Sequence, residues 1–163
     1  MNGPFSDAEE EELELLEYEL TKGEVTYGRM MKMYAEFLLA SIRRRQGAQE
    51  ISPSLELDLL VQHLQTAIAS FGTANSDGVR SACRVELVRL SRRLESERPD
   101  LAALLRCAVC CFYEEGGGWD PDKEEDATPI PLYLFLLKRF DPRMAAELLT
   151  YVRTHLLEKN CGP

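Results

Sequence analysis

The residues that could carry chemistry gather in one stretch of the chain, CAVCCFYEEGGGWDPDKEED, which runs from Cys107 to Asp126. It holds three cysteines, a glycine run, the only tryptophan and seven acidic side chains. Cys107 and Cys110 have the spacing of a metal or redox pair, and positions three apart share one face of a helix. From Asp120 onward, oxygen-bearing side chains stand at alternating positions, as they do in a calcium loop. These two patterns are the candidate sites.

The cysteines lack what a metal or redox site requires. A structural zinc site takes four ligands, but there is no second C-x-x-C, and His63 and His155 are remote and lie among apolar residues at helical spacing. A redox pair needs a helix N-terminus that lowers the thiol pKa, whereas Cys107 and Cys110 lie well inside an apolar helix. We interpret the cysteines as small core residues, expect no metal and no cofactor, and leave a redox role of the pair open.

The acidic stretch does not match a calcium loop at the fixed positions. An EF-hand needs glycine at its sixth position and glutamate at its twelfth, and Glu125 and Pro131 stand there instead. We therefore expect a solvated acidic loop over residues 114–127. The chain also lacks nucleophile–base motifs and phosphate-binding glycine loops. The sequence thus predicts no catalytic residues and a protein that is not an enzyme.

The elements that must position these residues are helices. Apolar residues recur at three- and four-residue steps in seven segments, and no segment alternates with period two. The segments start near Ser6, Thr26, Ser52-Pro53, Ser76 or Asp77, Pro99, Thr128-Pro129 and Asp141-Pro142, most of them at a capping or N1-proline signal. The fifth, LAALLRCAVCCFYEE, is apolar nearly all round and should be buried at the centre. The sequence predicts a single all-α domain over 1–163, a bundle of about seven helices with an acidic N-terminal helix at 6–22.

Composition and charge limit the partners. A chain of 163 residues that is 45% hydrophobic can form one compact domain with its own core. The net charge of −9 argues against nucleic acid, which needs a basic surface. Residues 1–24 carry −8 and residues 114–126 carry −6, which leaves an arginine-rich remainder of about +5. Such an uneven surface favours charged protein partners.

The compartment follows from what the chain lacks. No apolar run is long enough to span a bilayer, and the N-terminal stretch MNGPFSDAEEEELELL has neither the basic start nor the apolar core of a secretory signal. Five cysteines, an odd number without an export signal, indicate reduced thiols. We expect a cytoplasmic protein, with the nucleus also open, that is not secreted and has no membrane span.

One motif resembles a known family. GGGWD, Gly116 to Asp120, resembles the Gly-Gly-Trp-Asp segment of the second homology motif in Bcl-2 family apoptosis regulators. The order of about seven helices around an apolar fifth one is similar to that fold. LLRCAVCCFYEE and FLLKRFDPRMAAELLTYVRTHLL resemble the central and final helices of the divergent poxviral Bcl-2-like group. The family's Asn-Trp-Gly-Arg and Leu-x-x-x-Gly-Asp motifs and a C-terminal membrane tail are absent, as is common in that group.

The resemblance implies a Bcl-2-like, non-catalytic binding protein that inhibits host innate (NF-κB) signalling for a virus. The alternative is an apoptosis regulator that binds death-promoting helices in a hydrophobic groove. The expected partners are host signalling or apoptotic proteins, and a homodimer is left open. Trp119, in the acidic loop, is expected either to anchor an interface beside the first and last helices or to pack on the core. The competing groove would be lined by Leu59, Leu64, Ile68, Phe71, Val85 and Leu90.

Overall fold

The computed structural model describes residues 5–23, 25, 27–70, 77–112 and 130–157, and these residues form helices and no strand. The elements are α1 (Asp7–Lys22), α2 (Tyr27–Gly47), α3 (Leu55–Ser70), α4 (Asp77–Leu94), α5 (Pro99–Val109), a 3₁₀ turn η1 (Cys110–Phe112), α6 (Ile130–Phe140), α7 (Pro142–Val152) and a π-helical turn η2 (Arg153–Leu157). The predicted all-α fold with seven helices is confirmed. Every helix in the described part of the chain is too short or too polar to cross a membrane.

Local capping signals set several helix starts. The Ser6 hydroxyl accepts a hydrogen bond from the backbone N–H of Glu9 at 3.2 Å, and a Glu9 carboxylate oxygen accepts one from the N–H of Ser6 at 3.2 Å. This reciprocal pair is a capping box, as the sequence predicts. Asp141 caps α7, because its carboxylate accepts from the N–H of Arg143 at 3.0 Å. Proline occupies the first position of both α5 and α7, where its missing N–H costs nothing.

The predicted start of α3 is wrong by two residues. The sequence places the cap at Ser52 with Pro53 in the first turn, whereas the helix begins at Leu55. The Ser54 hydroxyl accepts the hydrogen bond from the N–H of Leu57 at 3.1 Å, so Ser54 is the capping residue. Two serines flank the proline, and the one next to the apolar stripe caps the helix. The predicted helix starts at Ser76 and Thr128-Pro129 lie outside the described residues.

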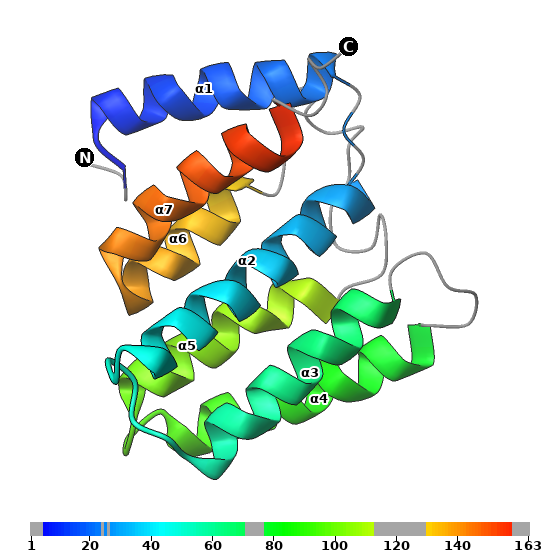
Figure 1. Cartoon of the computed structure of the whole chain (residues 1–163), viewed down its shortest axis with the longest axis vertical. Coiled ribbons are helices and arrows are strands. Elements are labelled where there is room, and N and C mark those ends of the chain that lie inside the picture. The colour runs from blue at the N-terminus through cyan, green and yellow to red at the C-terminus, as the bar shows by residue number, and fades with distance from the viewer. Residues whose placement is uncertain (1–4, 24, 26, 71–76, 113–129, 158–163) are drawn as a thin grey trace.

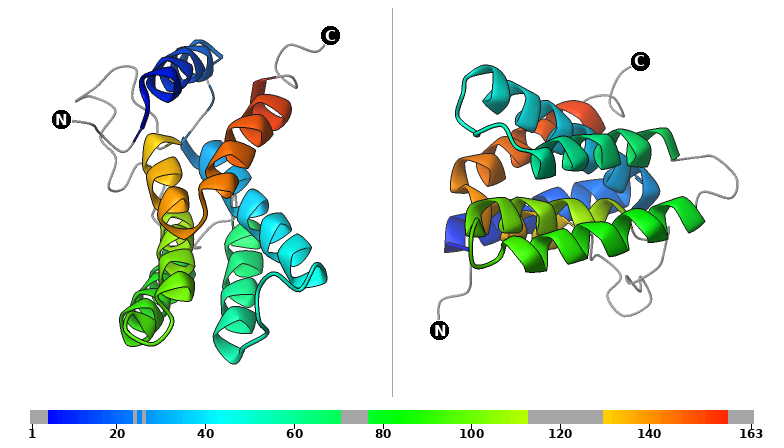
Figure 2. Two further views of the ribbon diagram at one scale, coloured as in Figure 1. Left: turned by 90° about the vertical axis from the view of Figure 1, so that its left-hand side faces the viewer. Right: turned by 90° about the horizontal axis from the view of Figure 1, so that it is seen from below.

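The helices pack as neighbouring pairs (Figure 1). α2 packs on α3, α4 on α5, and α6 on α7, while α5 also contacts α3 and α6. In the left panel of Figure 2, α4, α5 and α6 lie on one side of the molecule and α2 and α3 on the other. α1 lies across the ends of α6 and α7, where the Glu9–Lys138 and Glu12–Arg153 ion pairs measure 2.5 and 2.8 Å. The inner face of α1 is buried against the core and carries Leu13, Leu16 and Leu20.

The predicted central helix is confirmed as buried. Its buried residues, with those of η1, are Leu101, Ala102, Leu104, Leu105, Cys107, Ala108, Cys110, Cys111 and Phe112. α2 is an equal contributor to the core. Met31, Tyr34, Leu38 and Ile42 on α2 are each no more than 1% exposed. The core therefore forms where α2 faces α5 and η1.

A buried arginine joins the end of α2 to the start of α7. Arg45 is 5% exposed, and its guanidinium lies 3.1 Å from a carboxylate oxygen of Asp141 and 3.3 Å from one of Glu50. Burial is the largest influence on the pKa of Asp141 and raises it. Hydrogen bonds from the backbone and side chain of Arg143, with the charges of Arg45 and Arg143, outweigh burial, and the net pKa is lowered.

Replacing Arg45 with alanine is expected to lower the free energy of unfolding by about 2–3 kcal/mol. Removing one partner of a fully buried ion pair costs roughly 3–5 kcal/mol, and the cost is smaller here because Glu50 is half exposed. Urea denaturation measures the change. Arg43→Ala, an exposed change on the same helix, is the matched control and should stay within about 0.5 kcal/mol. Equal losses in the two variants would contradict the role of Arg45.

Candidate functional site

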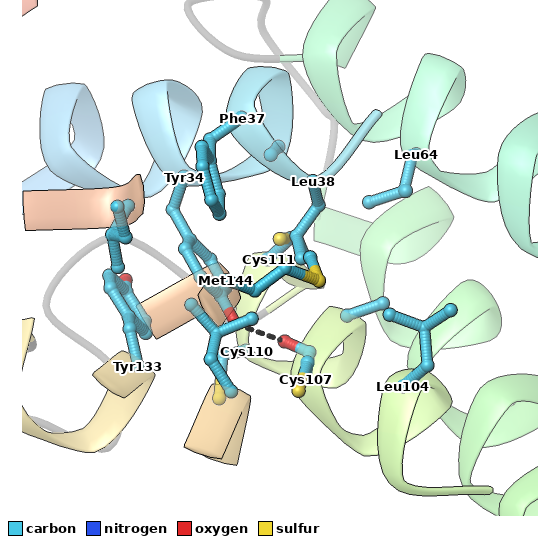
Figure 3. Packing of buried hydrophobic residues seen from close by; sticks show 14 of the residues in the cluster. Tyr34, Phe37, Leu38, Leu64, Leu104, Cys107, Cys110, Cys111, Tyr133 and Met144 are labelled. Atoms are coloured by element: carbon cyan, nitrogen blue, oxygen red, sulfur yellow. Dashed lines mark hydrogen bonds between the residues drawn. The ribbon is translucent and has the colours of Figure 1, made fainter. Parts of the chain in front are cut away.

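The cysteine cluster lies inside the helical core. Figure 3 shows Cys107, Cys110 and Cys111 among side chains of α2, α6 and α7. The Tyr34 hydroxyl donates a hydrogen bond to the backbone carbonyl of Cys107 at 3.1 Å, and its ring stacks on Tyr133 with 3.9 Å between centroids. Within the described residues, no three or more histidine, cysteine or acidic side chains are grouped to hold a metal ion.

Burial keeps these thiols protonated. It raises the pKa of Cys107 and of Cys110 to about 12, and it raises the pKa of Cys111 as well. Neighbouring thiols add to the rise at Cys107 and Cys111. A thiol needs its thiolate form to act as a nucleophile or a ligand. The prediction that the cysteines are small core residues is confirmed by their burial.

The folded chain is expected to protect these thiols from reagents. In a Cys161→Ser variant, we expect almost no reaction of Cys83, Cys107, Cys110 and Cys111 with a disulfide reagent at pH 8, and reaction of all four in guanidinium chloride. All four are buried, and burial raises the pKa of Cys83 too. Absorbance of the released thiolate measures the reaction. Rapid stoichiometric reaction of one thiol in the folded chain would show that it is accessible for chemistry.

Each histidine is engaged in packing. His63 on α3 packs edge-to-face against Phe112, with its Nε2 3.4 Å from a carboxylate oxygen of Glu86. That pair is not aligned as a hydrogen bond, so it acts through charge when the imidazole is protonated. His155 stacks on Tyr151 at 3.8 Å, and its Nδ1 lies 3.0 Å from the Tyr151 carbonyl oxygen. Both side chains are partly buried, and only 15% of the His63 side chain is exposed.

The predicted groove residues fall into different surroundings. Leu64 is 0% exposed and Leu90 is 7% exposed, so both belong to the core and face no open groove in this structure. Leu59 and Ile68 are partly buried against the core. Val85 is 45% exposed on α4. Phe71 and Trp119 lie outside the described residues.

Polar contacts bridge α3 and α4 along the seam where the groove is predicted. The helices run antiparallel, and the bridges follow them from one end to the other. They are Ser70–Arg80 at 3.1 Å, His63–Glu86 at 3.4 Å and Glu56–Arg93 at 3.4 Å. A helix that entered between α3 and α4 would have to break these contacts and expose buried leucines.

The structure instead shows two hollows that sequence reasoning missed. One, of about 380 Å³, lies between α2 and α7 and has Phe37, Tyr151 and His155 in its wall. The Arg44–Glu147 ion pair of 2.5 Å also lines it. The other, of about 240 Å³, lies where α5 meets α6. Each joins residues far apart in the sequence, so no local pattern could have placed them together.

Large apolar side chains also lie on the outside of four helices. They are Leu15 and Tyr18 on α1, Leu55 on α3, Val79 and Val85 on α4, and Leu132 and Phe135 on α6. Among these residues, only Val85 belongs to the groove that the sequence predicts. On α1 and α6, the signal in the sequence is an apolar residue on the side of the helix opposite its main apolar stripe.

Comparison with known proteins names no relative. No protein-family model, curated protein or solved structure matches this chain. The resemblance of Gly116 to Asp120 to a Bcl-2 motif stays a prediction, and those residues lie outside the described part of the chain.

Proposed function

We propose that this chain is a non-catalytic protein-binding module. The observation that carries the proposal is that α1, α4 and α6 each expose two large apolar side chains, which on α1 and α6 are three residues apart and share one face. Leu132 and Phe135 illustrate it, with 51% and 37% of their surfaces exposed on one side of α6. Apolar patches on a folded surface commonly mark contacts with other proteins. The four described thiols, by contrast, are buried in the core.

The finer proposal is a viral Bcl-2-like inhibitor of host innate (NF-κB) signalling that acts in the cytoplasm. Its support is the GGGWD resemblance together with the sequence order of helices around an apolar fifth one. The apoptosis alternative needs an open groove at α3 and α4, and the burial of Leu64 and Leu90 disfavours it. Immune signalling is therefore our first proposal.

A reporter experiment tests the proposed function. The full chain, expressed in mammalian cells with an NF-κB reporter, should reduce the response to a cytokine stimulus, and a tagged chain should co-purify a signalling protein from those cells. Serine replacements are made separately at the α1, α4 and α6 pairs, and at least one should abolish both effects while circular dichroism stays unchanged. An unaffected reporter and no co-purifying protein would refute the proposal. Micromolar binding of death-promoting helix peptides would favour the apoptosis alternative.

A further inference from the structure

The hollow between α5 and α6 has an apolar wall made of small side chains. Pro99, Ala102 and Ala103 of α5 contribute to it, and Leu136 of α6 does so from the other side. Its volume of about 240 Å³ equals that of roughly eight water molecules in the liquid. The space thus suits one large apolar side chain, which the alanines leave room for.

Positive charge rims this hollow. Glu95, Arg106 and Arg139 line it, and Arg106 donates a hydrogen bond of 2.6 Å to Glu95. That hydrogen bond is the largest influence lowering the pKa of Glu95, and the charges of Arg106, Arg92 and Arg139 lower it further. One carboxylate therefore faces three guanidinium groups. Arg139 is exposed and forms no ion pair with any residue that the structure describes.

The outer face of α6 extends the apolar wall. Leu132, Phe135 and Arg139 lie on the side of the helix opposite Tyr133 and Leu137, which are buried in the core. Leu136 stands between the outer face and the hollow. An apolar strip with arginine at one end therefore runs along α6. It lies beside the hollow, which also combines an apolar wall with arginine side chains.

We propose that this α5–α6 surface, made of Ala103, Arg106, Leu136 and Arg139 with the neighbouring Leu132 and Phe135, docks an acidic amphipathic helix of a partner protein. An apolar side chain of the helix enters the hollow, and carboxylates one turn away pair with Arg139 and Arg106. Charge complementarity selects the partner: the surface has an excess of arginine and apolar contacts beside it. The inference rests on the proposed protein-binding function and deepens it.

Peptide titration of the ¹⁵N-labelled full chain tests the surface. The probe is a 16-residue helical peptide with leucines along one face and glutamates beside them, and its counterpart has lysine at every glutamate. We expect the acidic peptide to shift the amide signals of Ala103, Arg106, Leu136 and Arg139, and to bind at least tenfold more tightly than the basic one. Raising the salt concentration should weaken the acidic peptide's binding.

Three variants separate charge from shape. Arg139→Glu should weaken binding of the acidic peptide at least tenfold, while Arg89→Glu, an exposed charge reversal on α4, should leave it unchanged. Ala103→Leu, which fills the hollow without changing charge, should also weaken it at least tenfold. Thermal unfolding of each variant shows that the fold is kept.

Several outcomes would overturn the assignment. They are equal binding of the two peptides, shifted signals confined to other helices, and no effect of Arg139→Glu. Self-association that is lost in both Arg139→Glu and Glu14→Arg would also overturn it, because a second copy's α1 would then occupy the surface. If the chain inhibits the reporter but Arg139→Glu and Ala103→Leu do so equally well, the surface is wrong and the function stands. If the unmodified chain neither inhibits the reporter nor captures a protein, the proposed function itself fails.

Discussion

Replacing Tyr34 with alanine is expected to lower the free energy of unfolding by about 4 kcal/mol, within the roughly 3–5 kcal/mol found for large aromatic-to-alanine changes in cores. Tyr34 is fully buried, stacks on Tyr133 and donates a hydrogen bond to the carbonyl of Cys107. The change would remove a side chain that connects α2, α5 and α6 at once. Chemical denaturation followed by circular dichroism measures it.

Two control variants divide this loss into its parts. Tyr34→Phe keeps the ring and removes only the hydrogen bond, which should cost about 1 kcal/mol. Tyr18→Ala removes a ring that is 59% exposed on α1, and the loss should stay within about 0.5 kcal/mol. If Tyr34→Ala lowers the free energy of unfolding no more than Tyr18→Ala does, the contacts of Tyr34 do not hold α2, α5 and α6 together.

The second large effect is expected in alkaline solution. The pKa of Cys107 and of Cys110 is about 12 in the folded chain, and the pKa of Cys111 is also raised. An unfolded thiol ionises near pH 8.5. Because the folded pKa lies above the unfolded one, these thiols stabilise the fold fully below about pH 8.5, and this contribution is lost as the pH rises toward 12. At pH 9.5 the free energy of unfolding should be lower by about 1.4 kcal/mol for each of Cys107 and Cys110, or about 3 kcal/mol for the two, and Cys111 adds to this loss.

Urea denaturation at pH 7.5, 8.5, 9.5 and 10 measures this dependence. Cys107→Ala removes one of the buried thiols with a raised pKa, so its stability should fall less steeply with pH than that of the unmodified chain. Arg43→Ala, which removes no thiol, should keep the original slope. A stability that is constant between pH 7.5 and 10 would show that the thiols are not buried in the way the structure describes.

Helix identity could be predicted from the sequence because its signals are local. The capping box of Ser6 and Glu9 and the cap of Asp141 act within one turn, so the residues that make them are adjacent in the printed sequence. The burial of α5 could also be predicted, since a helix that is apolar nearly all round has no side for water. The error at Ser52 arose because two serines flank Pro53 and both are plausible caps.

The candidate surfaces could not be predicted, because a helical stripe does not say what faces it. The sequence predicts that Leu64 and Leu90 line a groove, yet the same stripe marks core residues equally well, and both leucines lie in the core. α6 is at least as apolar as α5, but its outer face keeps Leu132 and Phe135 in solvent. The hollow beside Ala103 exists only because two helices distant in sequence meet there.

The three polar bridges between α3 and α4 have a consequence for alignment of these helices. Leucines along α3 repeat every turn, so apolar packing alone would tolerate a slide of α4 by one turn, or 5.4 Å. Such a slide would place Ala82 or Leu90 opposite His63 in place of Glu86. It would also separate the Arg80 guanidinium from the Ser70 hydroxyl. The polar contacts thus select a single register from several that hydrophobic burial would accept.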